Sequence, residues 1–245
     1  MIFTKRYTTK WHDTDAARRV RITKLLEYMQ ETSNAHMEAF GPSLDRLRDE
    51  HGLAFILSKT RINIYKPVYA YEDIEVRTWT CESRGFAIPR AYEILKDGIT
   101  VAQADTTWAL VDLDKGQLVK GSEGMSHYSF ENLPPVQSDV PVRFRLPSDA
   151  VLETVAQRRI VYSDLDYNMH MNNTKYTDML CDFIPLEDIG RISGVLLSYV
   201  NEASFGDILD VCHAKVGGVH YFRTVDQNGK ICLEAQLILN GEDSL

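Results

Sequence analysis

A short segment in the second half of the chain concentrates side chains that can move protons. Residues 164–176 read Asp-Leu-Asp-Tyr-Asn-Met-His-Met-Asn-Asn-Thr-Lys-Tyr. Asn168 and His170 lie two positions apart, so in an extended segment they project to the same side and can share one site. Histidine suits proton transfer near neutral pH, and a neighbouring carboxylate can orient it or act as the base itself. The segment therefore predicts acid–base chemistry.

The residues around this pair supply the remaining groups. A helix that begins near Asn173 directs free backbone N–H groups at the region just before it, where they could stabilise a developing oxyanion. We expect Asn172 or Asn173 to cap that helix. Glu202 is the candidate carboxylate, and it reaches His170 only if the strand that precedes it folds over the helix.

Other chemistries have little support in the sequence. It contains no G-x-S-x-G, G-x-x-x-x-G-K-[ST] or G-x-G-x-x-G motif, which disfavours a serine triad and nucleotide use. No cluster has the spacing of metal ligands, and Cys81, Cys181, Cys212 and Cys232 lie far apart. We predict no metal and no cofactor, and we expect the six histidines other than His170 to be structural.

An internal repeat determines the architecture. Trp11-His12-Asp13-Thr14-Asp15 in the first half resembles Tyr162-Ser163-Asp164-Leu165-Asp166 in the second, at an offset of 166 − 15 = 151 residues. Later, Tyr65 precedes Asp73 by eight residues, as Tyr199 precedes Asp207, at an offset of 207 − 73 = 134. The difference falls at residues 41–53, where we expect an extra loop or a short second helix in the first half only.

Each half contains a helical pattern followed by extended segments. Apolar residues recur at three- and four-residue steps from Ile22 to Phe40, and Gly41-Pro42 ends that pattern. Strands are expected over 54–66, 73–83, 86–96 and 100–112; the second half has a shorter helix over 174–183 and strands over 194–201, 207–216, 218–225 and 230–239. We predict an α+β fold of two tandem hotdog units, each a helix wrapped by an antiparallel sheet, joined side by side into one sheet.

The expected boundaries follow from composition. Residues 133–148 are aperiodic and punctuated by proline, which predicts a linker between an N-terminal unit (1–132) and a C-terminal unit (149–245). Superposing the repeats places Ala17 on Asn168, Arg19 on His170 and Val68 on Glu202. The first unit has therefore lost the proposed chemistry, and we expect it to contribute to binding of the substrate. Asp166 keeps its counterpart, Asp15, so a role in the turn explains it at least as well as catalysis.

The segment Asp164–Tyr176 resembles the D-x-N-x-H-x-N-N-x-x-Y signature of the acyl-acyl carrier protein (acyl-ACP) thioesterases of bacteria and plant plastids. Tyr199-Val200-Asn201-Glu202-Ala203 stands where that family has Y-x-x-E-C, and the resemblance covers about residues 5 to 240. It implies hydrolysis of a fatty acyl-ACP thioester, with acyl carrier protein as partner and with Asp166, Asn168, His170 and Glu202 as catalytic residues. Ala203 departs from the family's cysteine, which favours water over a thiol as the nucleophile.

Composition limits the partners. The net charge of -8 disfavours nucleic acid and anionic membranes, which attract basic surfaces. No apolar stretch is long enough to span a membrane, and the first residues lack a signal-peptide region, so we expect a cytoplasmic protein. The sequence leaves open whether the protein forms a homodimer. The alternatives to acyl-ACP hydrolysis are an acyl-CoA thioesterase and a non-catalytic acyl-carrier binding module.

Overall fold

The computed structural model describes residues 1–241. Its first half consists of β1 (Phe3–Thr8), η1 (Trp11–Asp13), α1 (Ile22–Phe40), α2 (Leu44–His51), β2 (Leu53–Ile64), β3 (Asp73–Thr80), β4 (Ile88–Lys96), β5 (Ile99–Asp112), β6 (Gln117–Val119), α3 (Gly121–Gly124) and η2 (Met125–His127). The second half contains β7 (Glu153–Arg159), η3 (Tyr162–Asp164), α4 (Lys175–Cys181), α5 (Leu186–Ile189), β8 (Ile192–Tyr199), β9 (Ile208–Val216), β10 (Val219–Asp226) and β11 (Ile231–Leu239).

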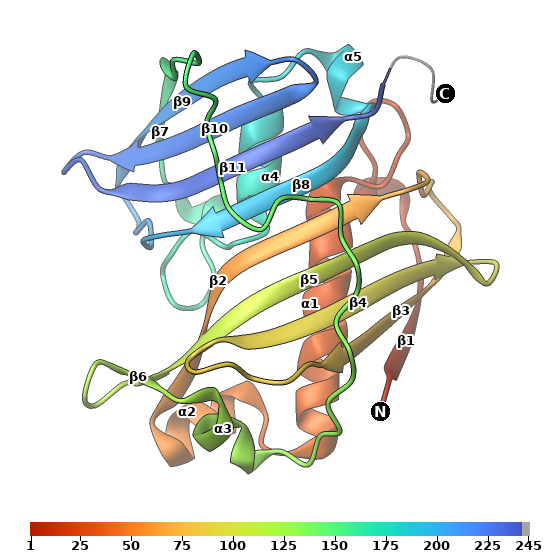
Figure 1. Cartoon of the computed structure of the whole chain (residues 1–245), viewed down its shortest axis with the longest axis vertical. Helices are drawn as coiled ribbons and strands as arrows, with labels where there is room; N and C mark the ends of the chain where they lie inside the picture. The colour runs from red at the N-terminus through yellow and green to blue at the C-terminus, as the bar shows by residue number, and fades with distance from the viewer. Residues whose placement is uncertain (242–245) are drawn as a thin grey trace.

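One antiparallel sheet runs through both halves. Its strand order is β1-β3-β4-β5-β2-β8-β11-β10-β9-β7, with β6 paired to β5. The halves join where β2 pairs with β8, in a register that places Thr60 opposite Leu197. Figure 1 shows the sheet as a curved layer with α1 and α4 against one face. The expected continuous sheet of two hotdog units is confirmed.

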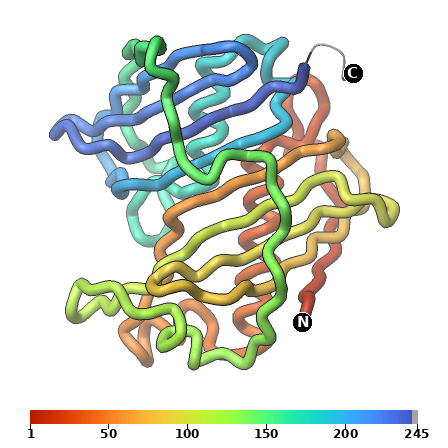
Figure 2. The backbone as a smooth tube through the Cα atoms, in the orientation of Figure 1, coloured from red at the N-terminus to blue at the C-terminus, as the bar shows by residue number. Residues whose placement is uncertain are grey.

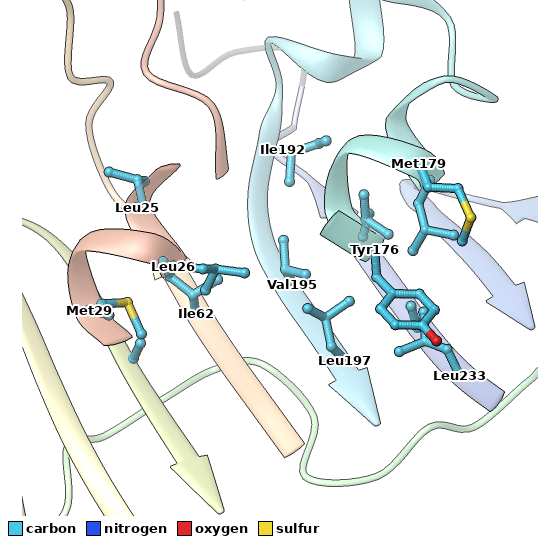
Figure 3. Close-up of a cluster of buried hydrophobic side chains, with 14 of the residues drawn as sticks. Leu25, Leu26, Met29, Ile62, Tyr176, Met179, Ile192, Val195, Leu197 and Leu233 are labelled. Carbon is cyan, nitrogen blue, oxygen red and sulfur yellow. The ribbon is translucent and has the colours of Figure 1, made fainter. Parts of the chain in front are cut away.

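The helices bury the apolar stripes that predicted them. On α1, Leu25, Leu26 and Met29 are each less than 5% exposed, and they face the sheet. They belong to one core with Tyr176 and Met179 of α4, so a single hydrophobic cluster crosses the boundary between the halves (Figure 3). Such burial is the main source of helix stability in a protein, because packing of an apolar face contributes more than helix propensity does.

A long segment without helix or strand, residues 129–152, crosses the opposite face of the sheet (Figure 2). Polar contacts hold it there: Leu133 N–H donates to the carbonyl of Thr80 at 2.9 Å, and Arg61 Nη1 donates to the carbonyl of Val140 at 2.8 Å. Val140 is only 2% exposed. The segment therefore covers the sheet as well as connecting the halves.

Several elements differ from the sequence-based expectations. The helix of the second half, α4, has only seven residues, because the chain turns at Asp182 and continues into the separate short helix α5. The sequence predicted either an extra loop or a short second helix in the first half, and the structure has the helix, α2. The edge strands β1 and β7 were not predicted; both alternate half-buried and exposed positions, which makes their apolar pattern weak.

Candidate active site

A tight loop, residues 164–172, carries the predicted acid–base residues. Asp166 organises it: its Oδ1 accepts the backbone N–H of Asn168 at 2.8 Å and that of His170 at 3.4 Å. Asp166 N–H in turn donates to the carbonyl of His170 at 2.9 Å. Met169 adopts a left-handed backbone conformation with φ of 66°. The expected extended backbone between Asn168 and His170 is therefore wrong, because a turn held by Asp166 sets their directions.

Glu202 lies beside His170, as predicted. The segment after β8 folds back onto the loop, where Met171 N–H donates to the carbonyl of Ala203 at 2.8 Å. This contact brings Oε2 of Glu202 to 3.3 Å from Nδ1 of His170. The side chains are 59% and 33% exposed, so both are accessible from solvent. A carboxylate at this distance favours the tautomer with the proton on Nδ1, in which Nε2 would be available to act as a base.

Asn168 is held by a residue from the other half of the chain. Nη1 of Arg48, on α2, donates to Oδ1 of Asn168 at 2.7 Å, and the same guanidinium lies 5.8 Å from the ring centre of Tyr167. Nothing in the sequence marks Arg48 as a functional residue. It lies in a charged helix 120 residues before Asn168, and only the fold brings the two together.

The start of the following helix has a different role from the one expected. The N-cap residue is Thr174 and no side chain caps the helix, so the expected cap by Asn172 or Asn173 is wrong. Asn172 instead closes a turn just before the helix, where its Oδ1 accepts the N–H of Thr174 at 3.0 Å. Its carbonyl also accepts the N–H of Lys175 at 2.9 Å. These two N–H groups are therefore engaged within the loop and are not open donors for a substrate oxyanion. The amide of Asn168 is the better candidate donor.

The first half contains the same loop without the same chemistry. Oδ1 of Asp15 accepts the N–H groups of Ala17 at 2.8 Å and Arg19 at 3.0 Å, and Arg18 has φ of 66° like Met169. The offset of 151 residues predicted from the sequence holds throughout this loop. Asp166 and Asp15 thus share a structural function, which is to hold a strained turn.

One detail of the repeat alignment is wrong by one residue. Val20 N–H donates to the carbonyl of Val68, as Met171 N–H donates to that of Ala203. Val68 is therefore the counterpart of Ala203, and Pro67, not Val68, is the counterpart of Glu202. The offset is therefore 203 − 68 = 135 residues and not 134. The sequence alignment paired the aspartates near the starts of β3 and β9, which are not equivalent in the structure.

The site in the first half carries no group able to act as a base in the position of Glu202. Pro67 has no polar side chain, and the guanidinium of Arg19 donates to the carbonyl of Gly190 in the second half. These residues line a cavity of about 870 Å³ between the halves. The first half therefore has a cavity at this position but lacks the acid–base residues of the second half.

A second hollow lies in the first half, beside α2. Its walls include Met37, Leu44, Phe55, Trp108 and Met125, and its volume is about 40 Å³. Leu44 and Arg48 are one turn apart on α2, so this helix contributes both to the hollow and to the contact with Asn168. Trp108 lines this hollow, while Met29 lies in the core.

The cysteines are poorly suited to nucleophilic attack. Burial raises the pKa of Cys181 to about 12 and that of Cys232 to about 11, so both thiols are protonated at neutral pH. Within residues 1–241, no group of three or more His, Cys, Asp or Glu side chains could hold a metal ion. In the same part of the chain, no helix combines the length and apolar character needed to cross a membrane.

Family comparisons agree with this geometry. The acyl-ACP thioesterase N-terminal domain matches residues 1–125, and the acyl-ACP thioesterase C-terminal domain matches residues 150–244. This chain belongs to the acyl-ACP thioesterase family. The two matched regions meet the functional loop once each, in its degenerate and its complete copy.

Individual acyl-ACP thioesterases are distant in sequence. The chloroplastic oleoyl-acyl carrier protein thioesterase 1 of Arabidopsis thaliana is 23% identical over 93% of this chain and 68% of its own length. The chloroplastic palmitoyl-acyl carrier protein thioesterase of Cuphea hookeriana is 21% identical over 86% of this chain and 54% of its own. The chain thus spans between about half and about two thirds of these plant proteins.

Solved structures show the same fold over the whole chain. An acyl-ACP thioesterase from Bacteroides thetaiotaomicron superposes with a TM-score of 0.86 at 22% identity, covering 98% of each chain. The 12:0-ACP thioesterase from Umbellularia californica gives a TM-score of 0.84 at 18% identity, covering 98% of this chain and 97% of its own. The paired hotdog architecture is therefore that of the acyl-ACP thioesterases.

Proposed function

We propose that the chain hydrolyses fatty acyl-ACP thioesters to free fatty acid and the carrier thiol. The observation that carries this proposal is the contact of 3.3 Å between His170 and Glu202 in the complete copy of the loop. The equivalent positions in the other copy are Arg19 and Pro67, which could not perform the chemistry. Family membership adds the thioester as the substrate class.

The geometry supports a mechanism with water as the nucleophile. Glu202 accepts the Nδ1–H of His170, and Nε2 removes a proton from water, which attacks the thioester carbonyl carbon. The Nδ2–H groups of Asn168 stabilise the oxyanion. The C–S bond then breaks, and the departing thiolate takes the proton held on Nε2. One water is consumed, and one acid and one thiol form.

In this proposal, Asp166 acts through the loop. Its carboxylate holds the N–H groups of Asn168 and His170 and so sets the directions of both side chains. The apolar hollow beside α2 receives the acyl chain. Met37 and Met125 on its wall are flexible thioether side chains that can shift to admit it.

The carrier distinguishes this proposal from the first alternative. Steady-state rates on acyl-ACP and acyl-CoA with the same acyl groups are expected to favour acyl-ACP in kcat/KM. A clear preference for acyl-CoA would show that the acyl carrier is coenzyme A, while the proposed chemistry would stay the same. Tight binding of acyl-ACP without release of fatty acid would instead establish the non-catalytic binding module.

A cytoplasmic location, a homodimer and the unit boundaries at 132 and 149 remain predictions from the sequence. Cell fractionation and light scattering on the purified protein would test the first two. Limited proteolysis within residues 133–148 would test whether that segment separates two units.

A further inference from the structure

A guanidinium lies inside the first half without a carboxylate to balance its charge. Arg90, on β4, is 4% exposed. Its Nη1 donates to Nδ1 of His36 at 2.9 Å and to Oγ1 of Thr78 at 3.2 Å, and its Nη2 donates to Sδ of Met37 at 3.0 Å. Within residues 1–241, no carboxylate oxygen lies within 4.0 Å of its nitrogens. Buried charges are normally paired, so this exception requires an explanation.

The groups around Arg90 do not offset its charge. Burial and the neighbouring guanidinium lower the pKa of His36 to about 3, so the imidazole is neutral and its Nδ1 accepts from Arg90 without contributing a negative charge. The ring of Phe130 lies 5.8 Å from the guanidinium carbon, which adds a weak cation–π attraction. Arginine keeps its proton in proteins, so a full positive charge remains.

Three buried hydroxyl groups without partners surround the same position. Among residues 1–241, Oγ1 of Thr80 and the hydroxyl groups of Tyr92 and Tyr128 have no hydrogen-bond partner. Thr80 lies opposite Arg90 in the pairing of β3 with β4, and Tyr92 is two residues along the same strand. Unsatisfied buried hydroxyl groups are rare in native proteins, and these three retain the capacity to bond to a polar group.

Arg90 also faces the hollow beside α2. It lines that hollow together with Ser33, Met37, Ile88 and Trp108, while Leu44 lies on the α2 side, one turn before Arg48. Within the described residues, its Nε–H has no acceptor, and the hydrogen bond to Met37 uses only one N–H of Nη2. The Nε–H and one Nη2–H lie along one edge of a guanidinium, and such an edge can bind a carboxylate in bidentate fashion.

We propose that Arg90 binds a carboxylate at the far end of the acyl chain, so that the site selects thioesters of dicarboxylic acids. This inference rests on the proposed thioester hydrolysis. The chain enters the hollow from the side of Asn168, its apolar part contacts Phe55 and Trp108, and its terminal carboxylate supplies the charge that Arg90 lacks. The hollow of about 40 Å³ has room for roughly one water, so Met37 and Met125 must shift as the chain enters.

The test uses pairs of acyl-ACP substrates of matched chain length, one ending in a methyl group and the other in a carboxylate. For the best length, wild-type protein is expected to prefer the carboxylate by about tenfold or more in kcat/KM, because a charge-assisted hydrogen bond replaces an unpaired charge. Arg90→Met is expected to abolish that preference, so that the two substrates of a pair are hydrolysed with similar kcat/KM. Arg90→Lys should retain part of the preference.

A preference for methyl-ended substrates at every length would overturn the inference, and so would an equal loss on both substrates in a folded Arg90→Met protein. The wild-type comparison is decisive by itself if that variant does not fold. Failure of the proposed function has a different signature, namely no hydrolysis of either substrate. In that case, calorimetric titration of His170→Ala with a dicarboxylate and the monocarboxylate of equal length decides: tighter binding of the dicarboxylate supports the Arg90 site, and equal binding contradicts it.

Discussion

Arg48 in the first half donates a hydrogen bond of 2.7 Å to Oδ1 of Asn168 in the second. An arginine side chain has only donors, so this contact fixes the orientation of the amide: Oδ1 faces Arg48, and the two Nδ2–H groups point elsewhere. The contact therefore determines what Asn168 can do in the reaction. It can donate to an oxyanion, and it is a poor acceptor for the attacking water.

We predict that Arg48→Met lowers kcat by about ten- to a hundredfold with a smaller change in KM, because a released amide no longer presents its donors reliably. Arg48→Lys should restore part of the rate, since lysine also only donates. Arg46→Met is the matched control: Arg46 is on the same helix, where it pairs with Glu50 at the surface. An equal fall in kcat for both Met variants would show that the effect comes from α2 in general.

Asp166 and Asp15 allow structural and catalytic roles to be separated. We predict that Asp166→Ala loses about tenfold or more in turnover, because the N–H groups of Asn168 and His170 lose their acceptor. Asp15→Ala should cost comparable stability at the equivalent turn and leave turnover near normal. Asp166→Asn retains an acceptor and should retain most activity. If Asp166→Asn is as inactive as the alanine variant, the negative charge takes part in the reaction.

Ala203 and the buried thiols predict hydrolysis without a covalent acyl-enzyme. Because burial raises the pKa of Cys181 and Cys232, neither supplies a thiolate at neutral pH. Activity should persist after treatment with an alkylating reagent. Intact-protein mass spectrometry on the reaction quenched during turnover should show the unmodified mass. An added acyl mass on any side chain would contradict the water mechanism.

The buried histidines predict that acid destabilises the protein. The pKa of His36 falls from 6.5 in the unfolded chain to about 3 in the folded protein, so between these values only the unfolded state binds the proton. The free energy of unfolding therefore decreases as pH falls below 6.5, by up to about 1.4 kcal/mol per pH unit for this group. His213, with its pKa lowered to about 4, acts in the same direction.

Denaturant unfolding followed from neutral pH down to about pH 4 would measure this slope. His36→Gln keeps an acceptor for Arg90 and removes the titrating ring, so its slope should be shallower. A His36→Gln protein with the slope of the wild type would show that other groups cause the acid sensitivity.

The architecture could be predicted because its signals are local. The stripe from Ile22 to Phe40 and the alternating strands depend on burial at fixed periods, and the repeat shows that the pattern occurs twice. The helix α4 was harder, since its apolar residues continue past the turn at Asp182. Edge strands such as β1 bury only one weak face, which gives a pattern close to that of a loop.

Only the part of the candidate site that lies within one segment of the sequence could be predicted. Asn168, His170 and Asp166 lie in one segment, whose backbone turn nevertheless differs from the extended form expected. Arg48 comes from a surface-type helix and approaches Asn168 only because β2 and β8 join the two halves. The unpaired charge of Arg90 likewise cannot be seen in a sequence, where an arginine in a strand looks solvated.

In the proposed mechanism, His170 and Glu202 in the second copy of the loop release fatty acid, while the first copy does not. The most direct measurement is the single-turnover release of fatty acid from acyl-ACP by wild type, His170→Ala, Glu202→Ala and Arg19→Ala, each with its fold checked by circular dichroism. We predict a loss of about a hundredfold or more for the two second-copy variants, as expected for removal of a positioned acid or base, and a near-normal chemical step for Arg19→Ala. Near-normal release by His170→Ala, or a collapse in Arg19→Ala with unchanged substrate binding, would contradict the account.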